Sequence, residues 1–194
     1  MIRTAVPIPS RAVPDRSATV PGLRSPSAGF DQPFEMLHAC HERVQRTLAL
    51  LERLQEHLRV RGCDAAAREA ARDVLRYFDI AAPLHHEDEE LHVFPPLLAH
   101  GDAGVVALVC ALQADHAAMA GGWAAARGPL AAIAAGEADG LPAQDGAALA
   151  AFAGLYATHI RREEEAAYPQ ARALLPEGAL GPMGQEMARR RGAV

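Results

Sequence analysis

Two segments of the chain carry a histidine that is followed four residues later by a glutamate, within a stripe of apolar side chains. The pairs are His85 with Glu89 and His159 with Glu163. Because residues i and i+4 of an α-helix point the same way, each pair can present an imidazole and a carboxylate to one point in space. Two further histidines, His41 and His116, each lie alone in an apolar stripe of helical spacing. The pattern predicts a helical protein whose interior holds four imidazoles and two carboxylates.

Apolar side chains recur at intervals of three and four residues through four long segments, as in helices that bury one face. The expected helices cover residues 33–60, 64–94, 103–127 and 144–167. Aromatic residues make up only 5% of the chain and alanine is abundant, which favours closely packed helices over a sheet. The expected fold class is all-α, an antiparallel up-down four-helix bundle.

Prolines predict where these helices bend or stop. Pro83 lacks a backbone donor and should kink the second helix about one turn before His85. Pro95 and Pro96 mark a change of direction, with room for a short final turn ending near residue 100. Pro129 would kink the third helix; if the helix continues past that kink, it extends over residues 129–135.

The two ends of the chain lack an apolar stripe. Residues 1–30 contain five prolines and four arginines, and we expect a disordered or loosely attached arm there. Residues 31–176 are the expected bundle. Residues 177–194 are the expected C-terminal tail, with a short exposed helix near its end. A chain of 194 residues fits one domain plus tails.

A repeat relates the two halves of the expected bundle. His85 precedes an aromatic-proline dipeptide at residues 94–95 by nine residues, and His159 precedes another at 168–169 by nine. Each half is therefore a helix with one histidine in its apolar stripe, followed by a helix that reads His-x3-Glu and ends in aromatic-Pro. Four antiparallel helices related by an approximate twofold axis would bring the two His-x3-Glu pairs face to face.

Imidazole and carboxylate donors together suit iron, manganese or zinc. Two carboxylates can each bridge two metals, and two histidines can complete each metal, which gives about four protein donors per metal. An oxo or hydroxo bridge would leave roughly one open position on each metal for O2, peroxide or NO. A metal also removes the cost of burying two glutamates on apolar faces. The predicted metal ligands are His41, His85, Glu89, His116, His159 and Glu163.

Other polar residues beside the two pairs are weaker ligand candidates. His86 and Glu90 repeat the spacing one residue out of register, about 100° around the helix, so we expect them to be neighbours of the site. His38 lies one turn before a predicted ligand and is a lesser candidate. Glu164 is the main rival of Glu163, but it would face the metals only if the helix widened locally into a π-bulge.

Four sequence blocks resemble hemerythrin-like proteins, specifically the HHE cation-binding domain, over about residues 31–175. The blocks are LHACHERVQRTLALLERL, HHEDEELHVFP, QADH and HIRREEEAAYP. The resemblance implies a four-helix bundle that holds a non-haem di-iron centre. It implies the same six ligands, two iron ions and an oxo or hydroxo bridge, with zinc or manganese as alternatives.

The chain departs from the oxygen-carrying hemerythrins at two places. Those proteins have a second histidine one turn from that of the third helix, where this chain offers Leu112 and Ala120. Their second acid lies five residues after its histidine, at the position of Glu164. With one imidazole fewer, both metals should be more open, which argues against reversible O2 carriage. The chain resembles the bacterial family members that have four histidines and two glutamates. This resemblance implies sensing of O2, NO or peroxide, iron handling, or repair of damaged iron centres.

Charge and cysteine content narrow the expected partners and location. The formal net charge of −5 does not suggest a surface for nucleic acid. Three unclustered cysteines fit free thiols in a reducing compartment, and no apolar run approaches the roughly 20 residues that span a bilayer. We therefore expect a cytoplasmic protein that binds a small diatomic ligand or peroxide, without nucleic-acid or membrane partners.

Three hypotheses for the function stay open at this point. The leading one is a protein that binds or senses O2, NO or peroxide at its di-iron site. The second is a di-iron enzyme that consumes peroxide or NO. The third is a module for interaction or iron handling that the metal only stabilises. The sequence does not indicate an oligomeric state.

Overall fold

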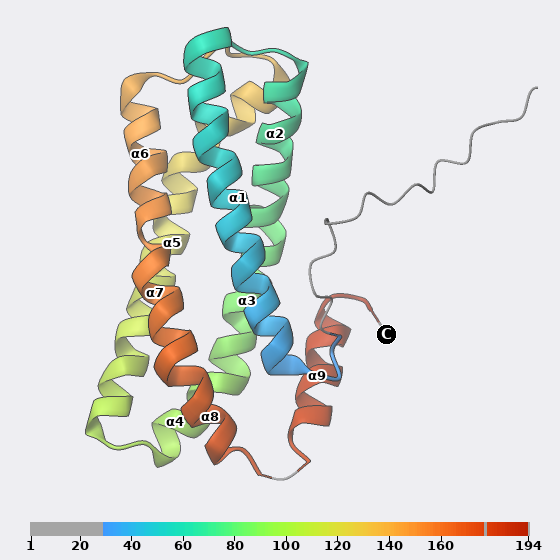
Figure 1. Ribbon diagram of the computed structural model, residues 1–194, viewed down its shortest axis with the longest axis vertical. Coiled ribbons are helices and arrows are strands. Elements are labelled where there is room, and N and C mark those ends of the chain that lie inside the picture. The colour runs from blue at the N-terminus through green and yellow to red at the C-terminus, as the bar shows by residue number, and fades with distance from the viewer. Residues whose placement is uncertain (1–28, 177, 194) are drawn as a thin grey trace, which may run out of the picture.

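The computed structural model of the chain describes residues 29–176 and 178–193, and every regular element in those ranges is helical (Figure 1). The predicted all-helical fold class is thereby confirmed. The arm expected at residues 1–30 falls outside the described residues, apart from its last two.

Four long helical segments lie side by side in the body of the molecule (Figure 1). The first is α1 (Pro33–Arg61). The second joins α2 (Ala65–Arg76), η1 (Tyr77–Ala81), α3 (Ala82–Asp88), η2 (Glu89–Val93) and α4 (Phe94–His100). The third is α5 (Ala103–Ala135). The fourth joins α6 (Ala143–Gly154), α7 (Tyr156–Arg162), η3 (Glu163–Ala167) and α8 (Tyr168–Leu174). A further helix, α9 (Leu180–Arg190), packs beside α1.

Capping residues fix where these segments begin and end. The carboxylate of Asp64 accepts a hydrogen bond from the Ala67 amide and starts α2, and Asp102 caps α5 in the same way. Both side chains satisfy amides that a helix leaves unpaired in its first turn. Gly136 follows α5 with a φ of 76°, a left-handed conformation that glycine adopts without strain. These contacts therefore define the starts of α2 and α5 and the end of α5.

The elements η1, η2 and η3 are π-helical turns, in which the helix widens by one residue. Each is followed within two residues by a proline, at positions 83, 95 and 169. A proline ring lacks an N–H and would clash with the carbonyl four residues earlier in a straight α-helix. The widened turn accommodates that defect, so the interruption predicted before His85 is a π-helical turn and the second segment continues to His100. Pro129 lies inside α5 without a π-helical turn before it, and the helix continues past it to Ala135.

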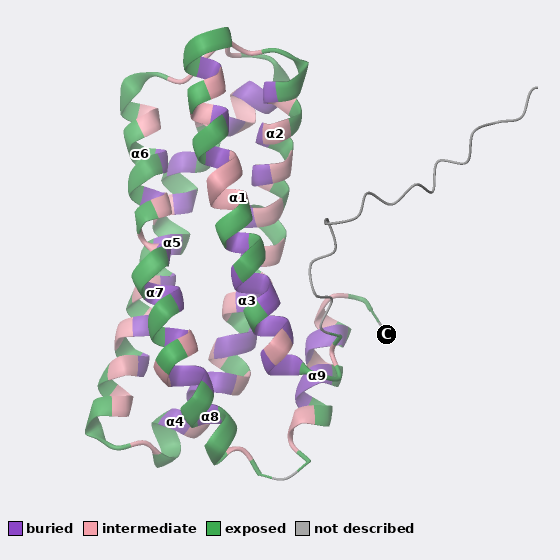
Figure 2. Ribbon diagram, viewed as in Figure 1, coloured by how far each residue is buried: buried purple, intermediate pink, exposed green. Residues whose placement is uncertain are grey.

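The apolar core has two parts, which lie on either side of the stripe histidines along each helix. One part surrounds Phe78, Trp123 and Phe152. The other surrounds Phe34 and Phe94, near α4 and α8. Figure 2 shows that the buried residues line the inner faces of the long helices. The polar cluster described below is therefore enclosed between two layers of apolar side chains.

The C-terminal helix α9 packs against the molecule instead of lying exposed as expected. Met183 and Met187 on one of its faces are buried in the core around Phe34. Next to this helix, Arg191 donates hydrogen bonds to both oxygens of the fully buried Asp88 carboxylate, at 2.5 Å from Nη2 and 3.1 Å from Nη1. Arg190 pairs with the same carboxylate. The expectation of an exposed tail helix was wrong. The contacts that bury this helix join residues a hundred or more positions apart, and local sequence patterns do not reveal such contacts.

By length and composition alone, α5 is long and apolar enough to cross a membrane, with a mean hydropathy of 1.5 over 18 residues. The expectation that no apolar run approaches this length was wrong. Only Asp115 and Arg127 are charged between residues 103 and 135, and alanine fills much of the remainder. The buried face of this helix carries His116 and packs against α2, α4 and α6.

Candidate metal centre

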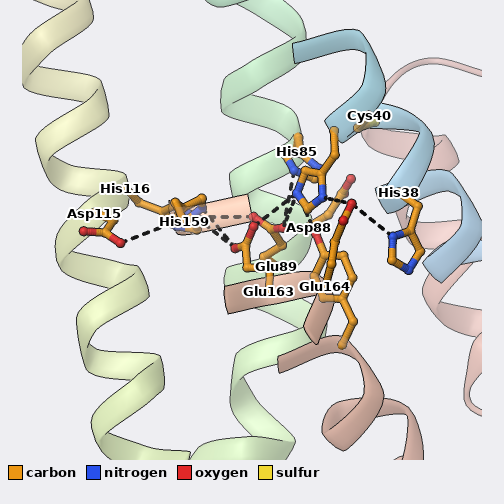
Figure 3. Close-up of polar contacts among 12 residues, drawn as sticks. His38, Cys40, His85, Asp88, Glu89, Asp115, His116, His159, Glu163 and Glu164 are labelled. Carbon is orange, nitrogen blue, oxygen red and sulfur yellow. Dashed lines mark hydrogen bonds and ion pairs between the residues drawn. The ribbon is translucent and has the colours of Figure 1, made fainter. Parts of the chain in front are cut away.

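All six predicted ligand residues meet in the interior, between the four long segments. Figure 3 labels all of them except His41. They form two groups of four donors, and in each group the donor atoms lie within 4.8 Å of one another. The first group is His41, His85, Glu89 and Glu163, and the second is Glu89, His116, His159 and Glu163. Both glutamates belong to both groups, as carboxylates that bridge two cations would.

Each glutamate lies between a histidine of its own helix and a histidine of another segment. Glu89 has one oxygen 3.3 Å from His85 Nε2 and the other 3.3 Å from His116 Nε2. Glu163 has one oxygen 3.1 Å from His159 Nε2 and the other 3.1 Å from His41 Nε2. The i,i+4 spacing accounts for the first contact of each pair and the packing of the segments for the second.

Buried polar atoms without hydrogen bonds mark the space between these residues. The two glutamates are fully buried and the four histidines are at most 8% exposed. Among the described residues, no hydrogen-bond partner is found for six of their atoms. Five of them contact other donor atoms across the cluster: Glu89 Oε2, both oxygens of Glu163, His116 Nε2 and His159 Nε2. The sixth, His85 Nδ1, is the outer nitrogen of a ring whose Nε2 lies near Glu89. Such atoms are costly to bury unless something else binds them, and a set of nitrogen and oxygen lone pairs fits metal cations.

Protons occupy part of the cluster when metal is not bound. Burial alone would lower the pKa of His41, but its contacts with Glu163 and Glu164 raise it to about 9. Burial is likewise outweighed at His116, where contacts with Glu163 and Glu89 raise the pKa to about 10. Burial opposes ionisation of Glu163, yet the surrounding histidines hold its pKa well below the usual range. Imidazolium ions therefore balance the buried carboxylates near neutral pH, and metal binding must displace these protons.

Glu164, the rival of Glu163, binds the cluster from outside. Its Oε1 accepts a hydrogen bond from His41 Nδ1 at 2.9 Å. The side chain of Glu164 is 37% exposed, whereas that of Glu163 is fully buried. The π-helical turn η3 is present, yet Glu163 is the acid that faces the interior. Glu164 therefore orients the imidazole of His41 so that Nε2 points inward, a common arrangement around metal-binding histidines.

The second half of the molecule repeats this outer contact. Glu90 Oε1 accepts a hydrogen bond from His116 Nδ1 at 3.0 Å. Glu90 also accepts one from Gln113, and Glu164 contacts His38 in the corresponding way. His38 is therefore placed outside the inner cluster. The glutamate after each His-x3-Glu pair was the available sequence signal for these contacts, because it too recurs in both halves.

Tyr168 is a member of the site that the sequence marked only as part of an aromatic-proline repeat. Its hydroxyl donates a hydrogen bond to Glu89 and lies 3.1 Å from His41 Nε2. Burial, together with Glu89 and Glu163, raises the pKa of this phenol well above its usual value, so the hydroxyl keeps its proton. Phe94, at the matching place in the repeat, stacks on His116 without offering a hydroxyl.

Two further side chains lie against the His116–His159 side. Asp115 Oδ2 lies 3.4 Å from His159 Nδ1 (Figure 3). The ring of His86 stacks on His116, with 4.1 Å between centroids. Burial, followed by repulsion from His116 and His85, lowers the pKa of His86 to about 2, so this imidazole is uncharged. His86 is thus a neighbour of the site, as expected, and lies close to two of its donors.

The buried donor groups in a helical framework define a class of protein, a helical metal-binding domain. Residues 32–171 match the hemerythrin HHE cation-binding domain, and this chain belongs to that family. The resemblance seen in the sequence is confirmed. The chain is also similar to an uncharacterized protein of Haemophilus influenzae, with 44% identity over 71 residues. These residues are 37% of this chain and 41% of that protein, so the chain spans less than half the length of this relative.

Proposed function

We propose that the cluster is a non-haem di-iron carboxylate centre that binds O2 or a related small oxidant, such as peroxide or NO. The observation that carries this proposal is the sharing of Glu89 and Glu163 by both four-donor groups. A mononuclear site would need only one such group. The proposal includes an antiparallel, up-down order of the four long segments, with His41, His85, His116 and His159 as the terminal ligands.

The chemistry of the donors supports iron over a softer metal. Within the described part of the chain, the clustered atoms are imidazole nitrogens and carboxylate oxygens, a set that suits iron, manganese or zinc. With about four protein donors on each ion, coordination positions stay open for a small ligand. The free cysteines lie outside the donor groups and suit a reducing compartment. We propose a cytoplasmic location on this basis.

Metal analysis combined with an optical spectrum tests the proposal. Iron-loaded protein should contain about two irons per chain, and its absorption should change on exposure to air, peroxide or NO. Saturation at one iron, or a spectrum that none of these ligands alters, contradicts a dinuclear centre that binds small oxidants.

Consumption of peroxide or NO is a second candidate function, which Tyr168 favours. Its protonated hydroxyl contacts Glu89 and His41 at the edge of one donor group. A proton donor at that place can hydrogen-bond or protonate a small oxygen-containing ligand as it reacts. Repeated turnover of peroxide or NO by the iron-loaded protein, reduced severalfold in Tyr168→Phe, would select the enzyme over the binding protein.

A further inference from the structure

A further group of possible metal ligands lies at the surface, beside the His41–His85 side of the cluster (Figure 3). His38, His41 and Glu164 have donor atoms that all lie within 4.8 Å of one another. His41 turns its Nε2 toward Glu163 in the interior, so His38 and Glu164 are the members that can bind something outside the cluster. Both reach solvent, with 47% and 37% of their side chains exposed.

The internal repeat shows what is particular to this pair. In the other half, Gln113 takes the place of His38 and Glu90 takes the place of Glu164. The Gln113 amide donates to Glu90 Oε2 at 2.7 Å, an ordinary hydrogen bond. His38 Nδ1 lies 3.3 Å from Glu164 Oε1, which is long for such a bond. An imidazole offers a lone pair to a metal and an amide nitrogen does not, so the pair in the first half has two metal-binding groups where its counterpart has one.

The separation of the two donor atoms fits a single ion. Metal bonds of about 2.1 Å place a nitrogen and an oxygen about 3.0 Å apart at a right angle and about 3.4 Å apart at a tetrahedral angle. The distance of 3.3 Å between His38 Nδ1 and Glu164 Oε1 lies between these values. Glu164 Oε1 can bind an ion while it accepts the hydrogen bond from His41, because a carboxylate oxygen has two lone pairs.

The surroundings hold the ring of His38 in place without occupying its nitrogens. Tyr168 packs edge-on against this imidazole, with 5.3 Å between centroids and 81° between planes. Among the described residues, no partner is found for His38 Nε2 or for the second oxygen of Glu164. The guanidinium of Arg172 is paired with Glu35, one turn before His38, so its positive charge is compensated. The pair is therefore free to accept a cation from solution.

We propose that His38 and Glu164 form an outer site for a divalent cation, at which ions from solution bind before they enter the centre. An imidazole nitrogen and a carboxylate oxygen suit Zn²⁺, Mn²⁺ or Fe²⁺. With two protein donors the site is weak and exchangeable, and desalting should empty it. His41 links it to the interior, because this ring contacts Glu164 with its outer nitrogen and Glu163 with its inner one. The entry role rests on the two-metal centre proposed above, whereas the outer site does not.

Zinc binding to the full chain tests whether the outer site exists. Once the tight sites are filled, equilibrium dialysis should detect one further Zn²⁺, which His38→Gln should bind at least about tenfold more weakly, since even partners that only orient a ligand change affinity by this much. In ¹⁵N-histidine-labelled protein, a ring nitrogen of His38 should shift to the range of metal-bound imidazole as this ion binds. An unchanged His38 ring, or equal zinc binding by wild type and His38→Gln, would overturn the outer site. Fewer than two tightly bound zinc ions would instead count against the proposed centre.

Two substitutions provide matched comparisons. Gln113→His gives the other half the same pair of groups beside Glu90 and should add a further weakly bound zinc ion. His57→Gln removes a different histidine near the surface, which lies 3.0 Å from Asp64, and should leave the zinc-dependent shift of His38 unchanged. A Gln113→His variant that binds no additional zinc would contradict the argument that an imidazole beside this glutamate makes a cation site.

Rates of metal uptake test the entry role. When Co²⁺ is added to the metal-free chain, the visible absorption of the inner sites should develop severalfold more slowly in His38→Gln than in the wild type or in His57→Gln. The affinity of the inner sites should stay within about threefold, because His38 is not one of their donors and does not contact one through its own ring nitrogens. Uptake at the wild-type rate in His38→Gln would overturn the entry role.

Discussion

The His41–His85 side of the centre and the His116–His159 side use the same donor types, yet different side chains surround them. Tyr168 places a hydroxyl against the first side, while the matching Phe94 places a bare ring against the second. On the second side, Asp115 Oδ2 accepts a hydrogen bond from Nδ1 of His159, the nitrogen that points away from the cluster. On the first side, Cys40 takes the place that Asp115 has in the internal repeat. There, His85 Nδ1 has no hydrogen-bond partner among the described residues.

The two halves of the repeat therefore share the donors and the outer glutamates that orient two of the histidines. They differ in the side chains around the donors, so we expect the two sides to behave differently. The first side has a proton donor near the interior and a less firmly oriented histidine. The second side has an acceptor that fixes the ring of His159, and the uncharged ring of His86 stacks on His116. We expect the first side to exchange ligands and the second to hold its metal more tightly.

Removal of the metals should produce the largest effect. Two ions that bind only the folded chain each stabilise it by several kcal/mol at concentrations well above Kd. For a chain of this length, we expect chelation to lower the Tm by on the order of 10 °C or more. Calorimetry at increasing chelator concentration should show two steps, because the two sides differ. An unchanged Tm would mean that the metals do not lie in the core, and one step would remove the difference between the sides.

The two adjacent glutamates of η3 provide the next test. Glu163→Ala should lose one or both metals, because Glu163 faces both donor groups. Glu164→Ala should keep two metals, with affinity lowered by at most about a hundredfold, because Glu164 only orients His41. Metal content after desalting measures both. Glu89→Ala and Glu90→Ala are the corresponding pair in the other half, so loss of iron from Glu164→Ala but not from Glu163→Ala would break the repeat.

The metal-free protein should lose stability as the pH rises. Despite burial, contacts with glutamates raise the pKa of His41 to about 9 and of His116 to about 10. Both values exceed that of an unfolded histidine, about 6.5. The stabilisation is therefore complete below about pH 6.5 and disappears as the pH rises through 9 and 10.

Urea unfolding in chelator should show a decrease of a few kcal/mol in the free energy of unfolding between pH 6.5 and 10. Protein loaded with metal is the control, since its ligating histidines carry no proton on the bound nitrogen. A parallel decrease in both forms would place the titrating groups elsewhere. NMR of the metal-free protein should show His41 deprotonating before His116.

Tyr168→Phe should have the smallest effect and would make the first side resemble the second. Loss of one buried hydrogen bond should reduce the free energy of unfolding by about 1–2 kcal/mol. Two metals should remain bound, with an altered optical spectrum. Tyr77→Phe removes a hydroxyl that binds the Cys40 carbonyl away from the donors, so a comparable spectral change in that control would count against a specific role for Tyr168.

Helical spacing was sufficient to predict the all-helical fold and which six side chains would meet. The i,i+4 rule fixes the direction of His85 and Glu89 within one helix, and the repeat fixes their counterparts. Because both pairs lie in apolar stripes, burying the stripes brings the donors together. Whether these residues ligate metal stays a prediction.

Features off the apolar stripe could not be predicted in the same way. The direction of Tyr168 depends on the π-helical turn before it, and this turn arises from a proline in a particular packed context. The contact of Asp88 with Arg191 joins residues 103 positions apart, and local sequence patterns do not encode such pairings. The position of His86 against His116 likewise follows from how two segments pack.

The division of the donors between the halves suggests how such a centre could originate. His41 and His85 come from one helical hairpin, His116 and His159 from the next, and each hairpin adds one shared glutamate. A single hairpin of this kind, paired with a second copy about a twofold axis, would assemble the same set of donors. Duplication and fusion of an ancestral gene would preserve this arrangement and free the two copies to diverge around it.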